Sequence, residues 1–438
     1  MITLDEIQPR AKAHFAAIAR ARPWPPAQPV ALAFLHGILF LTILISPLVV
    51  IEPSPYDGAL VLLGLACILA RVPFPRGLLP LFLLLILWKV SGMVSLMPVV
   101  EKTHTVRFTS ASVFMAFTAI IYACLFAEDS LRRLAIMRRA YIIAAVIASM
   151  IGMTGYFNLV PGAAQMFLEN GRVSATFKDP NVFGPFLVLP LLMLIWPMLM
   201  QRMKLPHLVA LFVLLLGLFL SFSRGAWVNF ALSAFIMIAL AFFIAPDSRA
   251  RGRIIFLTVI AAAALTGLFA FANSFDVIGD MFRERAKIAQ NYDVGSGGRF
   301  TLQELAIGEL LAYPLGLGPF GFARLHGMQQ HNVYLQAFLV YGWLGGFAYI
   351  TMVLMTILLG FRSALVSTPW QPYVIIALAA FVGLFVEGFV IDTDHWRHHF
   401  LLLGIVWGLA IASERSRRGM LAPKAESLSV QQPVIARS

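Results

Sequence analysis

Residues 273–336 read NSFDVIGDMFRERAKIAQNYDVGSGGRFTLQELAIGELLAYPLGLGPFGFARLHGMQQHNVYLQ. This segment is the one long interval between apolar runs in which charged residues are frequent. Connections of this length are uncommon in a compact domain unless they are functional or disordered. The spacing predicts helices over 275–291 and from Arg299 to Ala312, separated by the glycine-rich residues 295–298 and followed by a Pro/Gly-rich connection over 313–322. We therefore expect an ordered, partly helical loop that carries the chemistry.

The rest of the chain is dominated by apolar runs. Of its 438 residues 60% are hydrophobic and only 12% are charged, a composition far from that of a soluble domain. A membrane-spanning helix needs about 20 apolar residues, and runs of this length must be helical because lipid offers their backbone no hydrogen-bond partners. We predict an all-α polytopic integral membrane protein with about twelve spans: 29–51, 58–71, 77–98, 109–127, 140–160, 181–200, 205–222, 226–245, 254–272, 335–360, 372–390 and 398–413.

The distribution of positive charge predicts the topology. With the N-terminus in the cytoplasm, 21 of the 33 Lys and Arg residues fall in cytoplasmic segments and 11 in outer ones, Lys89 being inside a span, as the positive-inside rule requires. We expect no cleavable signal peptide. The predicted organisation is a cytoplasmic tail over 1–28, one transmembrane domain over 29–413 with a long periplasmic loop over 273–334, and a cytoplasmic tail over 414–438.

Several classes of function are disfavoured. The net charge of +12 comes from cations that alternate with the spans rather than forming one basic face, so we expect no nucleic-acid partner. Cys67 and Cys124 lie in apolar runs, which argues against a disulfide or a cysteine metal site. Residues 392–399 (DTDHWRHH) are rich in ligand types, but they are consecutive rather than spaced as one ligand set. We prefer an interfacial anchor at Trp396, with Asp392 or Asp394 lining a site.

Two arginines stand where the sequence offers little structural reason for them. Arg224 follows a run so apolar that it must lie at the membrane boundary, where it either snorkels to the interface or binds a phosphate or diphosphate with its planar fork. Arg299 opens a predicted helix, where its charge opposes the helix macrodipole. That placement favours a ligand-binding role.

The connection between the fifth and sixth spans adds further candidates. Arg172 and Lys178 bring two more cations to the same face. Asp179 precedes Pro180 and matches an N-cap followed by proline in the first turn, so capping and substrate contact are both open for Asp179 and Asn181.

A histidine stands at the mouth of the tenth span. His331 is flanked by Gln329, Gln330 and Asn332, and it serves either as a polar cap or in catalysis and substrate contact. Glu387, inside an apolar span, is a costly placement that usually faces a cavity or a partner, and its role is open.

Taken together, these motifs resemble a known family. The runs RVSATFKDPNVFG at 172–184, SRG at 223–225, GRF at 298–300, HNVY at 331–334 and GWLGG at 342–346 resemble the O-antigen ligase/polymerase family, over about residues 140–360. The resemblance implies a metal-independent glycosyltransferase without a cofactor. Such proteins take a glycan from undecaprenyl diphosphate on the periplasmic side of the bacterial inner membrane and pass it to a sugar acceptor, either a glycan or the lipid A–core.

The resemblance also assigns roles by motif. It implies that Arg224 and Arg299 bind the diphosphate and that His331 is the essential histidine, either as the general base or as a group that positions the acceptor. We expect substrate contacts from Arg172, Lys178, Asp179, Asn181, Asn332 and Asp392. Fixed cations would stabilise the charge that develops on the leaving diphosphate, and a neutral histidine can accept a proton near neutral pH.

Other hypotheses remain open. Polymerase and ligase are not distinguished by these motifs, and for a polymerase a chain-length regulator is a further candidate partner. A transporter or flippase for an anionic or lipid-linked solute should carry ionisable or broken helices near the bilayer midplane, where we find only Lys89 and Glu387. A purely structural membrane subunit would leave the charged loop unexplained.

Overall fold

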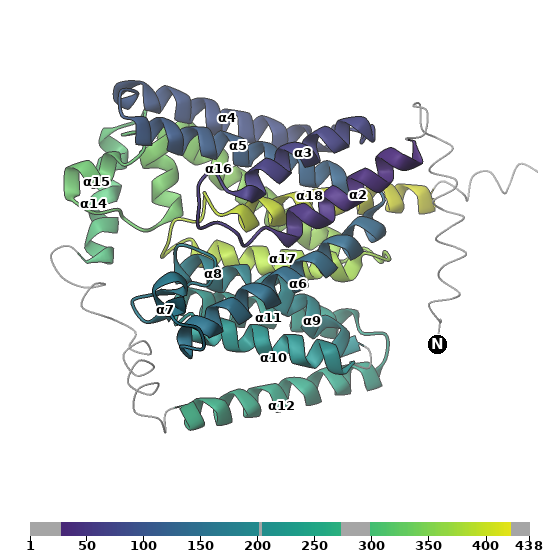
Figure 1. The fold of residues 1–438 in the computed structure, drawn as a ribbon. Coiled ribbons are helices and arrows are strands. Elements are labelled where there is room, and N and C mark those ends of the chain that lie inside the picture. Colours follow the sequence, from purple (N-terminus) through teal and green to yellow (C-terminus); the bar gives the residue numbers. More distant parts are fainter. Residues whose placement is uncertain (1–27, 201–203, 273–297, 422–438) are drawn as a thin grey trace, which may run out of the picture.

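The chain is almost entirely helical in the computed structural model, which describes residues 28–200, 204–272 and 298–421 (Figure 1). The long helices are α2 (Pro29–Leu44), α3 (Pro55–Leu69), α4 (Leu79–Leu96), α5 (Thr103–Ala127), α6 (Ser130–Tyr156), α9 (Val188–Met200), α10 (Leu205–Leu220), α11 (Arg224–Ile244), α12 (Ser248–Ala272), α14 (Arg299–Ala312), α16 (Val333–Ala364), α17 (Gln371–Glu387) and α18 (Arg397–Leu421). The short elements are η1 (Arg76–Leu78), η2 (Met97–Val99), α7 (Ala163–Phe167), α8 (Pro180–Phe186), α15 (Gly321–His326) and the strands β1 (Leu168–Glu169) and β2 (Arg172–Val173). The all-α prediction is confirmed.

Each predicted span contains a helix, with α8 and α9 sharing one span. Among the described residues, six helical segments are long and apolar enough to cross a membrane: Arg76–Val99, Thr103–Ala127, Ser130–Tyr156, Pro180–Met200, Arg224–Ile244 and Val333–Ala364. The helices α2, α3, α10 and α17 are apolar but shorter. The chain is therefore a multi-pass membrane protein, and the count of twelve spans stays a prediction.

The first helix is shorter than predicted. It ends at Leu44 instead of continuing to residue 51, because proline lacks the N–H that a helix interior needs and Pro47 follows shortly after. The segment from 45 to 54 continues as a loop, and its Val49 N–H donates to the carbonyl of Thr176 over 3.3 Å. This contact joins the loop to the connection between α6 and α8.

The last helix is longer than predicted. It runs past residue 413 to Leu421. Glu414 pairs with Arg417 over 2.8 Å and with Arg418 over 2.7 Å, one helical turn later. Such pairs stabilise exposed helical turns, so part of the predicted C-terminal tail is helical. The predicted helix over 275–291 lies outside the described residues.

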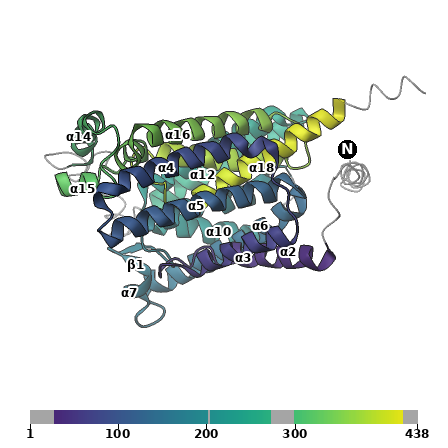
Figure 2. The ribbon, with the colours of Figure 1, turned by 90° about the horizontal axis from the view of Figure 1, so that it is seen from above.

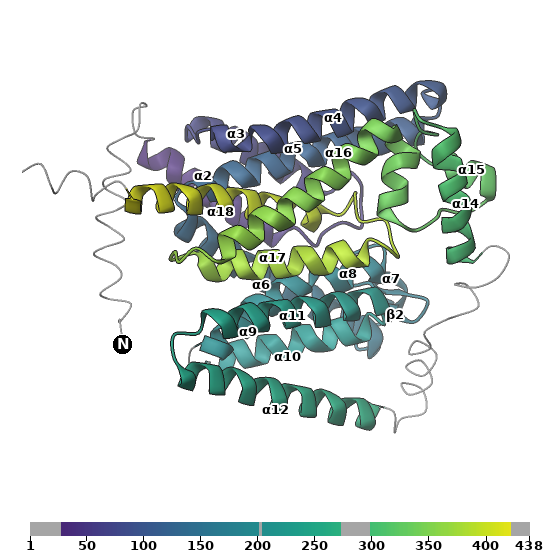
Figure 3. The same ribbon diagram turned by 180° about the vertical axis from the view of Figure 1, so that it is seen from behind.

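The helices pack side by side as a bundle, with α18 against α5, α16 against α4 and α11 against α17 (Figures 2 and 3). Its interior is filled by large side chains that are fully buried, among them Trp88, Tyr122, Tyr341 and Trp407. Large apolar side chains such as Phe212 and Phe243 are exposed. Exposed apolar surface of this extent is expected where a protein faces lipid.

The connections fall at two ends of the bundle. At one end, named here the α14 end, lie α7, α14 and α15 (Figure 1), and the connection after α2 meets the segment before α8 through the Lys178–Glu52 ion pair of 3.1 Å. At the opposite end the Trp370 indole donates to the Ser413 hydroxyl over 2.9 Å. The grouping matches the alternation that the charge pattern predicts. Which end faces the periplasm stays a prediction.

Helix α16 is broken near its first third, a feature that the sequence reasoning missed. Gly342 has a φ of 68°, and a Cβ at this position would lie 2.8 Å from backbone atoms of Leu315. The preceding connection replaces the helical hydrogen bonds: Leu317 N–H donates to the Leu339 carbonyl over 2.6 Å, and Trp343 N–H donates to the Pro314 carbonyl over 2.8 Å. Non-helical backbone at membrane depth is tolerated where protein satisfies it, and here it fastens the segment after α14 onto α16.

The grouping of the connections gives a labelling test. In a variant without Cys67 and Cys124, single cysteines at the exposed positions Gln165 and Ser367 should react oppositely with a membrane-impermeant thiol reagent. We expect Gln165→Cys to label in intact cells and Ser367→Cys to label only after permeabilisation. Equal labelling of the two from outside would contradict the topology.

Candidate functional site

His331 and Asn332 precede the first residue of α16 and have different roles there. Asn332 is the N-cap: its side-chain oxygen accepts from the backbone N–H groups of Tyr334 over 3.0 Å and Leu335 over 3.2 Å. Because Asn332 fills the capping role, His331 does not have to. The backbone of His331 has a φ of 48°, an uncommon conformation for a residue other than glycine, and 43% of its side chain is exposed.

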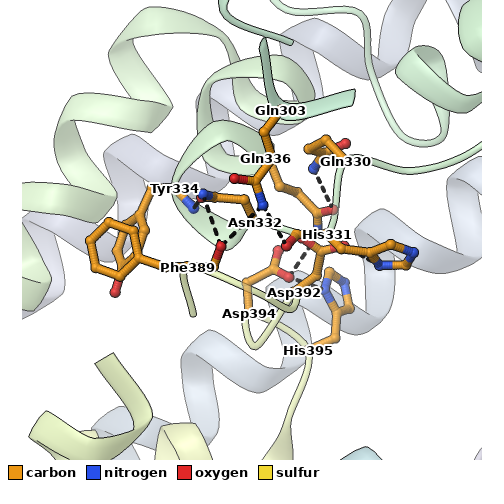
Figure 4. Close-up of polar contacts among 10 residues, drawn as sticks. All are labelled: Gln303, Gln330, His331, Asn332, Tyr334, Gln336, Phe389, Asp392, Asp394 and His395. Carbon is orange, nitrogen blue, oxygen red and sulfur yellow. Dashed lines mark hydrogen bonds and ion pairs between the residues drawn. The ribbon is translucent and has the colours of Figure 1, made fainter. Parts of the chain in front are cut away.

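Two other elements, α14 and the end of α17, hold this backbone in place (Figure 4). The side-chain amide of Gln303, on α14, donates to the His331 carbonyl over 3.4 Å and to the Phe389 carbonyl over 3.1 Å. Asn332 also donates to Phe389, over 3.2 Å. The N–H of Val333 donates to the carbonyl of Gly388 over 2.9 Å. The end of α17 and the start of α16 are thereby fixed to α14.

Charged groups surround the His331 ring. Its Nδ1 lies 3.8 Å from Oδ2 of Asp392, longer than a hydrogen bond. Burial lowers the pKa of His331, and the positive charge of Arg299 lowers that pKa further, while Asp179 acts in the opposite direction. The ring is therefore held neutral at neutral pH, the state that a general base requires.

The pKa values of Asp392 and Asp394 are displaced in opposite directions although only Thr393 separates the two residues. Burial raises the pKa of Asp392 to about 8, and the neighbouring charge of Asp394 adds to the rise. Burial also opposes ionisation of Asp394, but His395, Lys89 and a hydrogen bond from Tyr341 outweigh it and hold the pKa of Asp394 at about 2. Pairs of carboxyl groups with divergent pKa values are a feature of catalytic sites.

Asp394 is the end of a buried polar chain. Gln336 donates to its Oδ1 over 2.8 Å, and the Tyr341 hydroxyl donates to its Oδ2 over 3.0 Å. Ser112 links Tyr341, at 2.9 Å, to the amine of Lys89, at 2.6 Å. Sequence reasoning identified Lys89 as an ionisable residue in a span but not its partner. A lysine in a span needs a buried anionic partner. The carboxylates of 392–394 are the feature of the sequence that could have indicated this partner.

A second cluster lies where the α6–α8 connection meets α11. The dipeptide Asn170-Gly171 has φ values of 50° and 73° and closes the β1–β2 hairpin, a turn in which both central residues need positive φ. The hairpin presents Arg172, which donates to the Ser221 carbonyl over 3.0 Å and to Oδ1 of Asn181 over 2.7 Å. Ser223 donates to the same oxygen over 3.0 Å. Arg172 and Asn181 therefore fix the connection onto the start of α11.

Asp179 caps α8, as its sequence context predicts. Its Oδ1 accepts from the Asn181 N–H over 2.7 Å. Arg224 is the half-buried first residue of α11, and Ser223 is the N-cap of that helix. The start of α11 also packs against the end of α17, since a Cβ on Gly225 would lie 2.8 Å from the Glu387 carboxylate.

The expected site residues therefore fall into three places. Arg299, His331, Asn332 and Asp392 come together, with Asp179 close enough to influence the pKa of His331. Arg172, Asn181 and Arg224 form the adjoining cluster at the start of α11. Lys178 lies apart, with 52% of its side chain exposed beside Glu52.

Glu387, whose role was open, has partners inside the bundle. The Asn229 amide donates to its carboxylate over 2.7 Å, and Ser233 donates to Asn229 over 3.1 Å. Trp396 is only 7% exposed, so the expectation that it anchors the chain at the lipid interface is wrong. Over the described ranges no group of three or more His, Cys, Asp or Glu residues is arranged to hold a metal ion.

The lowered pKa of His331 predicts its chemical reactivity. Diethylpyrocarbonate modifies neutral imidazole, so we expect His331 to react down to a lower pH than an ordinary histidine, whose pKa is about 6.5. In Arg299→Gln the nearby positive charge is lost, so the acid limit of modification should move to higher pH. Peptide mass spectrometry measures both without requiring activity. An unshifted limit in Arg299→Gln would contradict the electrostatic coupling.

A comparison with protein families gives a match over part of the chain. Residues 209–350, about a third of the chain, match the family described as O-antigen ligase. The matched segment runs from α10 into α16 and contains Arg224, Arg299 and His331. No curated protein matches the chain. Over residues 209–350 this membrane protein is therefore similar to the O-antigen ligase family.

Proposed function

We propose that this chain is a glycosyltransferase that moves an oligosaccharide from undecaprenyl diphosphate to a sugar acceptor at the periplasmic face of the bacterial inner membrane. The observation that carries the proposal is the meeting of Arg299, His331 and Asp392 at the α14 end of an apolar bundle. All but Asp392 lie inside the segment that matches the O-antigen ligase family.

Both candidate diphosphate-binding arginines open a helix. Arg224 is the first residue of α11 and Arg299 is the first residue of α14. A helix N-terminus presents unpaired N–H groups and a partial positive charge, which favour an anion. An arginine there adds a planar fork suited to two phosphate oxygens. This pairing explains the placement of cations that the helix dipole disfavours, and it would stabilise the leaving diphosphate without a metal ion or other cofactor.

His331 would act on the acceptor. The acceptor hydroxyl oxygen forms a bond to the anomeric carbon, the bond from that carbon to the diphosphate oxygen breaks, and the hydroxyl proton passes to His331. Nδ1 is the ring nitrogen that faces Asp392, 3.8 Å from its carboxyl group. Nε2, on the other side of the ring, would accept the proton. The imidazolium that forms would favour ionisation of Asp392, and the resulting carboxylate would stabilise the positive charge on His331.

The remaining expected residues would bind or position substrate. Asn332 holds the entrance of α16, and Arg172 with Asn181 holds the α6–α8 connection. Asp179, which influences His331 electrostatically, would contact the acceptor, and Lys178 would contact a more distant sugar. A ligase would use the lipid A–core as acceptor, whereas a polymerase would use a growing glycan and work with a chain-length regulator. Neighbouring genes for a flippase and such a regulator would favour the polymerase.

A second candidate is a transporter or flippase for an anionic or lipid-linked solute. The break in α16 at Gly342 and the buried polar chain from Lys89 to Asp394 favour it, since broken helices and buried charges occur in transporters. Against it, the freed backbone groups at the break bind protein rather than line a solute site. The polar clusters around His331 and Arg172 also lie at the α14 end.

The arginines can be tested by substitution. We expect Arg224→Ala and Arg299→Ala each to abolish glycan transfer while the protein remains folded and inserted. Lysine should restore little, because a point charge lacks the bidentate fork. Transfer would be measured with purified protein in nanodiscs, a lipid-diphosphate oligosaccharide and an acceptor. Full activity of Arg224→Lys would support a snorkelling arginine and remove the diphosphate role.

His331 should behave differently from the arginines. We expect His331→Ala to bind the donor normally but to transfer it about 10²–10⁴-fold more slowly, the usual contribution of a positioned base. The arginine variants should lose donor affinity as well as rate. Activity of the wild type should survive EDTA; loss with chelator would support a metal site at 395–399 instead. Unchanged turnover in His331→Ala would take His331 out of the mechanism.

A further inference from the structure

A cavity of about 190 Å³ opens beside the candidate site. It lies between the connection after α2, the segment before α8 and the start of α18, and its wall includes Ser46, Tyr56, Phe177, His395, Trp396 and His398. Neither the proposed diphosphate site nor the proposed base accounts for it. Ligand sites are typically apolar cavities with a few placed polar groups, and this wall has that composition.

Besides Nδ1 of His395, which lies 3.2 Å from Asp394, two buried polar atoms in the wall have no hydrogen-bond partner among the described residues. They are the hydroxyl of Ser46, which is 7% exposed, and Nε2 of His398, which is 6% exposed. A buried polar group without a hydrogen bond costs about 1–3 kcal/mol, so each requires an explanation. His398 also borders a smaller void of about 10 Å³, room for one water molecule at most. A ligand with several hydroxyl groups would satisfy both atoms.

The cavity wall also contains the charged residues Glu52, Lys178 and Arg397, and their pairing points to a neutral ligand. Lys178 lies against Glu52 at 3.1 Å, and Arg397 forms a bidentate ion pair with Asp57 at 2.9 and 3.0 Å. These cations are thus neutralised, unlike an anion-binding set. Apart from these paired charges, the wall offers imidazole, hydroxyl and aromatic groups, and the rings of Trp396 and His398 have centroids 5.2 Å apart. Half-exposed charged side chains also place the opening toward water rather than toward lipid chains.

The cavity connects to His331 through one short segment. His395, in the cavity wall, contacts Asp394 over 3.2 Å, and Asp392, before it in the same connection, faces His331. Helix α8 separates the cavity from the cluster at the start of α11: Asn181 bonds Ser223 there, whereas Val182 and Phe186 line the cavity. A ligand in the cavity would thus approach His331 from the side away from Arg224.

We propose that this cavity is a saccharide subsite that binds an uncharged sugar unit of the acceptor. The proposal rests on the proposed transfer function and adds where the acceptor is selected. The aromatic rings would cover the apolar face of a pyranose, and Ser46 and His398 would bond its hydroxyl groups.

The test compares two neighbouring histidines. His398→Phe keeps a planar aromatic ring but removes the nitrogens from the cavity. His399→Phe is the matched control, because His399 is 2% exposed and its nitrogens also lack partners among the described residues, yet it packs on Tyr349 and Phe381 instead of lining the cavity. Ser46→Met, which fills the cavity, is an independent second variant.

Binding is measured first, on full-length protein in nanodiscs. The probes are short oligosaccharides released by mild acid from the lipid-linked glycan, and the lipid A–core oligosaccharide, with saturation-transfer NMR as the readout. We expect binding by wild type and by His331→Ala, and loss of binding in His398→Phe and Ser46→Met but not in His399→Phe. Undecaprenyl phosphate should not compete. Competition by this lipid, or unchanged saccharide binding in both cavity variants, overturns the subsite.

Transfer kinetics separate the subsite from the proposed function. In His398→Phe we expect the acceptor KM to rise by about tenfold, the effect of one lost hydrogen bond, with kcat and the donor KM unchanged. A change in donor KM alone would contradict an acceptor site. If saccharide binding depends on His398 but the wild type transfers no glycan, the proposed transferase function is wrong and the subsite stands. If the wild type transfers glycan and the cavity variants behave as it does, the subsite is wrong and the transferase function stands.

Discussion

The structure depends on the lack of hydrogen-bond partners in lipid. Apolar segments must satisfy their own backbone groups and therefore form helices, which leaves chain ends and connections as the places for polar chemistry. The break in α16 obeys the same constraint, because residues 314–317 supply the hydrogen bonds that Gly342 interrupts. The Pro/Gly-rich connection and α14 before it are thereby held on the bundle, and with them Arg299 beside His331.

At the α14 end this constraint produces a dense arrangement of fixed groups. Helices α11 and α14 each begin with an arginine, α16 begins with a capping asparagine, and the strained His331 precedes it. The buried hydrogen-bond chain from Lys89 to Asp394 fixes the connection between α17 and α18 from the interior of the bundle. Such preorganisation is what an enzyme needs in order to stabilise charge that appears only during reaction.

Much of this architecture was predictable from local patterns. Apolar length gave the helices, and Gly298 and Ala312 bound α14 as the glycine break and helical spacing indicated. Asp179 is a cap because Asp-Pro favours a helix start. The motifs that resemble the O-antigen ligase family fall largely in the segment that matches it. The roles of Arg224, Arg299 and His331 remain predictions.

Other features depend on contacts between distant segments, which periodicity cannot reveal. The end of α2 follows from Pro47, but the loop after it is placed by Thr176. The anionic group nearest Lys89 in its polar chain is Asp394, in the last connection. Helix α16 is interrupted at Gly342 because residues 314–317 form hydrogen bonds with the backbone on either side of it. Trp396 was expected at the interface because it lies in a connection rich in histidine and carboxylate residues, yet it is buried in the wall of a cavity. In each case tertiary packing overrides a local preference.

The most direct measurement is an electron cryomicroscopy structure of the protein in nanodiscs with an undecaprenyl-diphosphate oligosaccharide. Our account predicts that the diphosphate lies at the α14 end, within hydrogen-bond distance of the guanidinium groups of Arg224 and Arg299, with the anomeric carbon facing His331. A diphosphate bound deep between the helices near Lys89 or Glu387, with both arginines away from it, would contradict the account and favour a transporter.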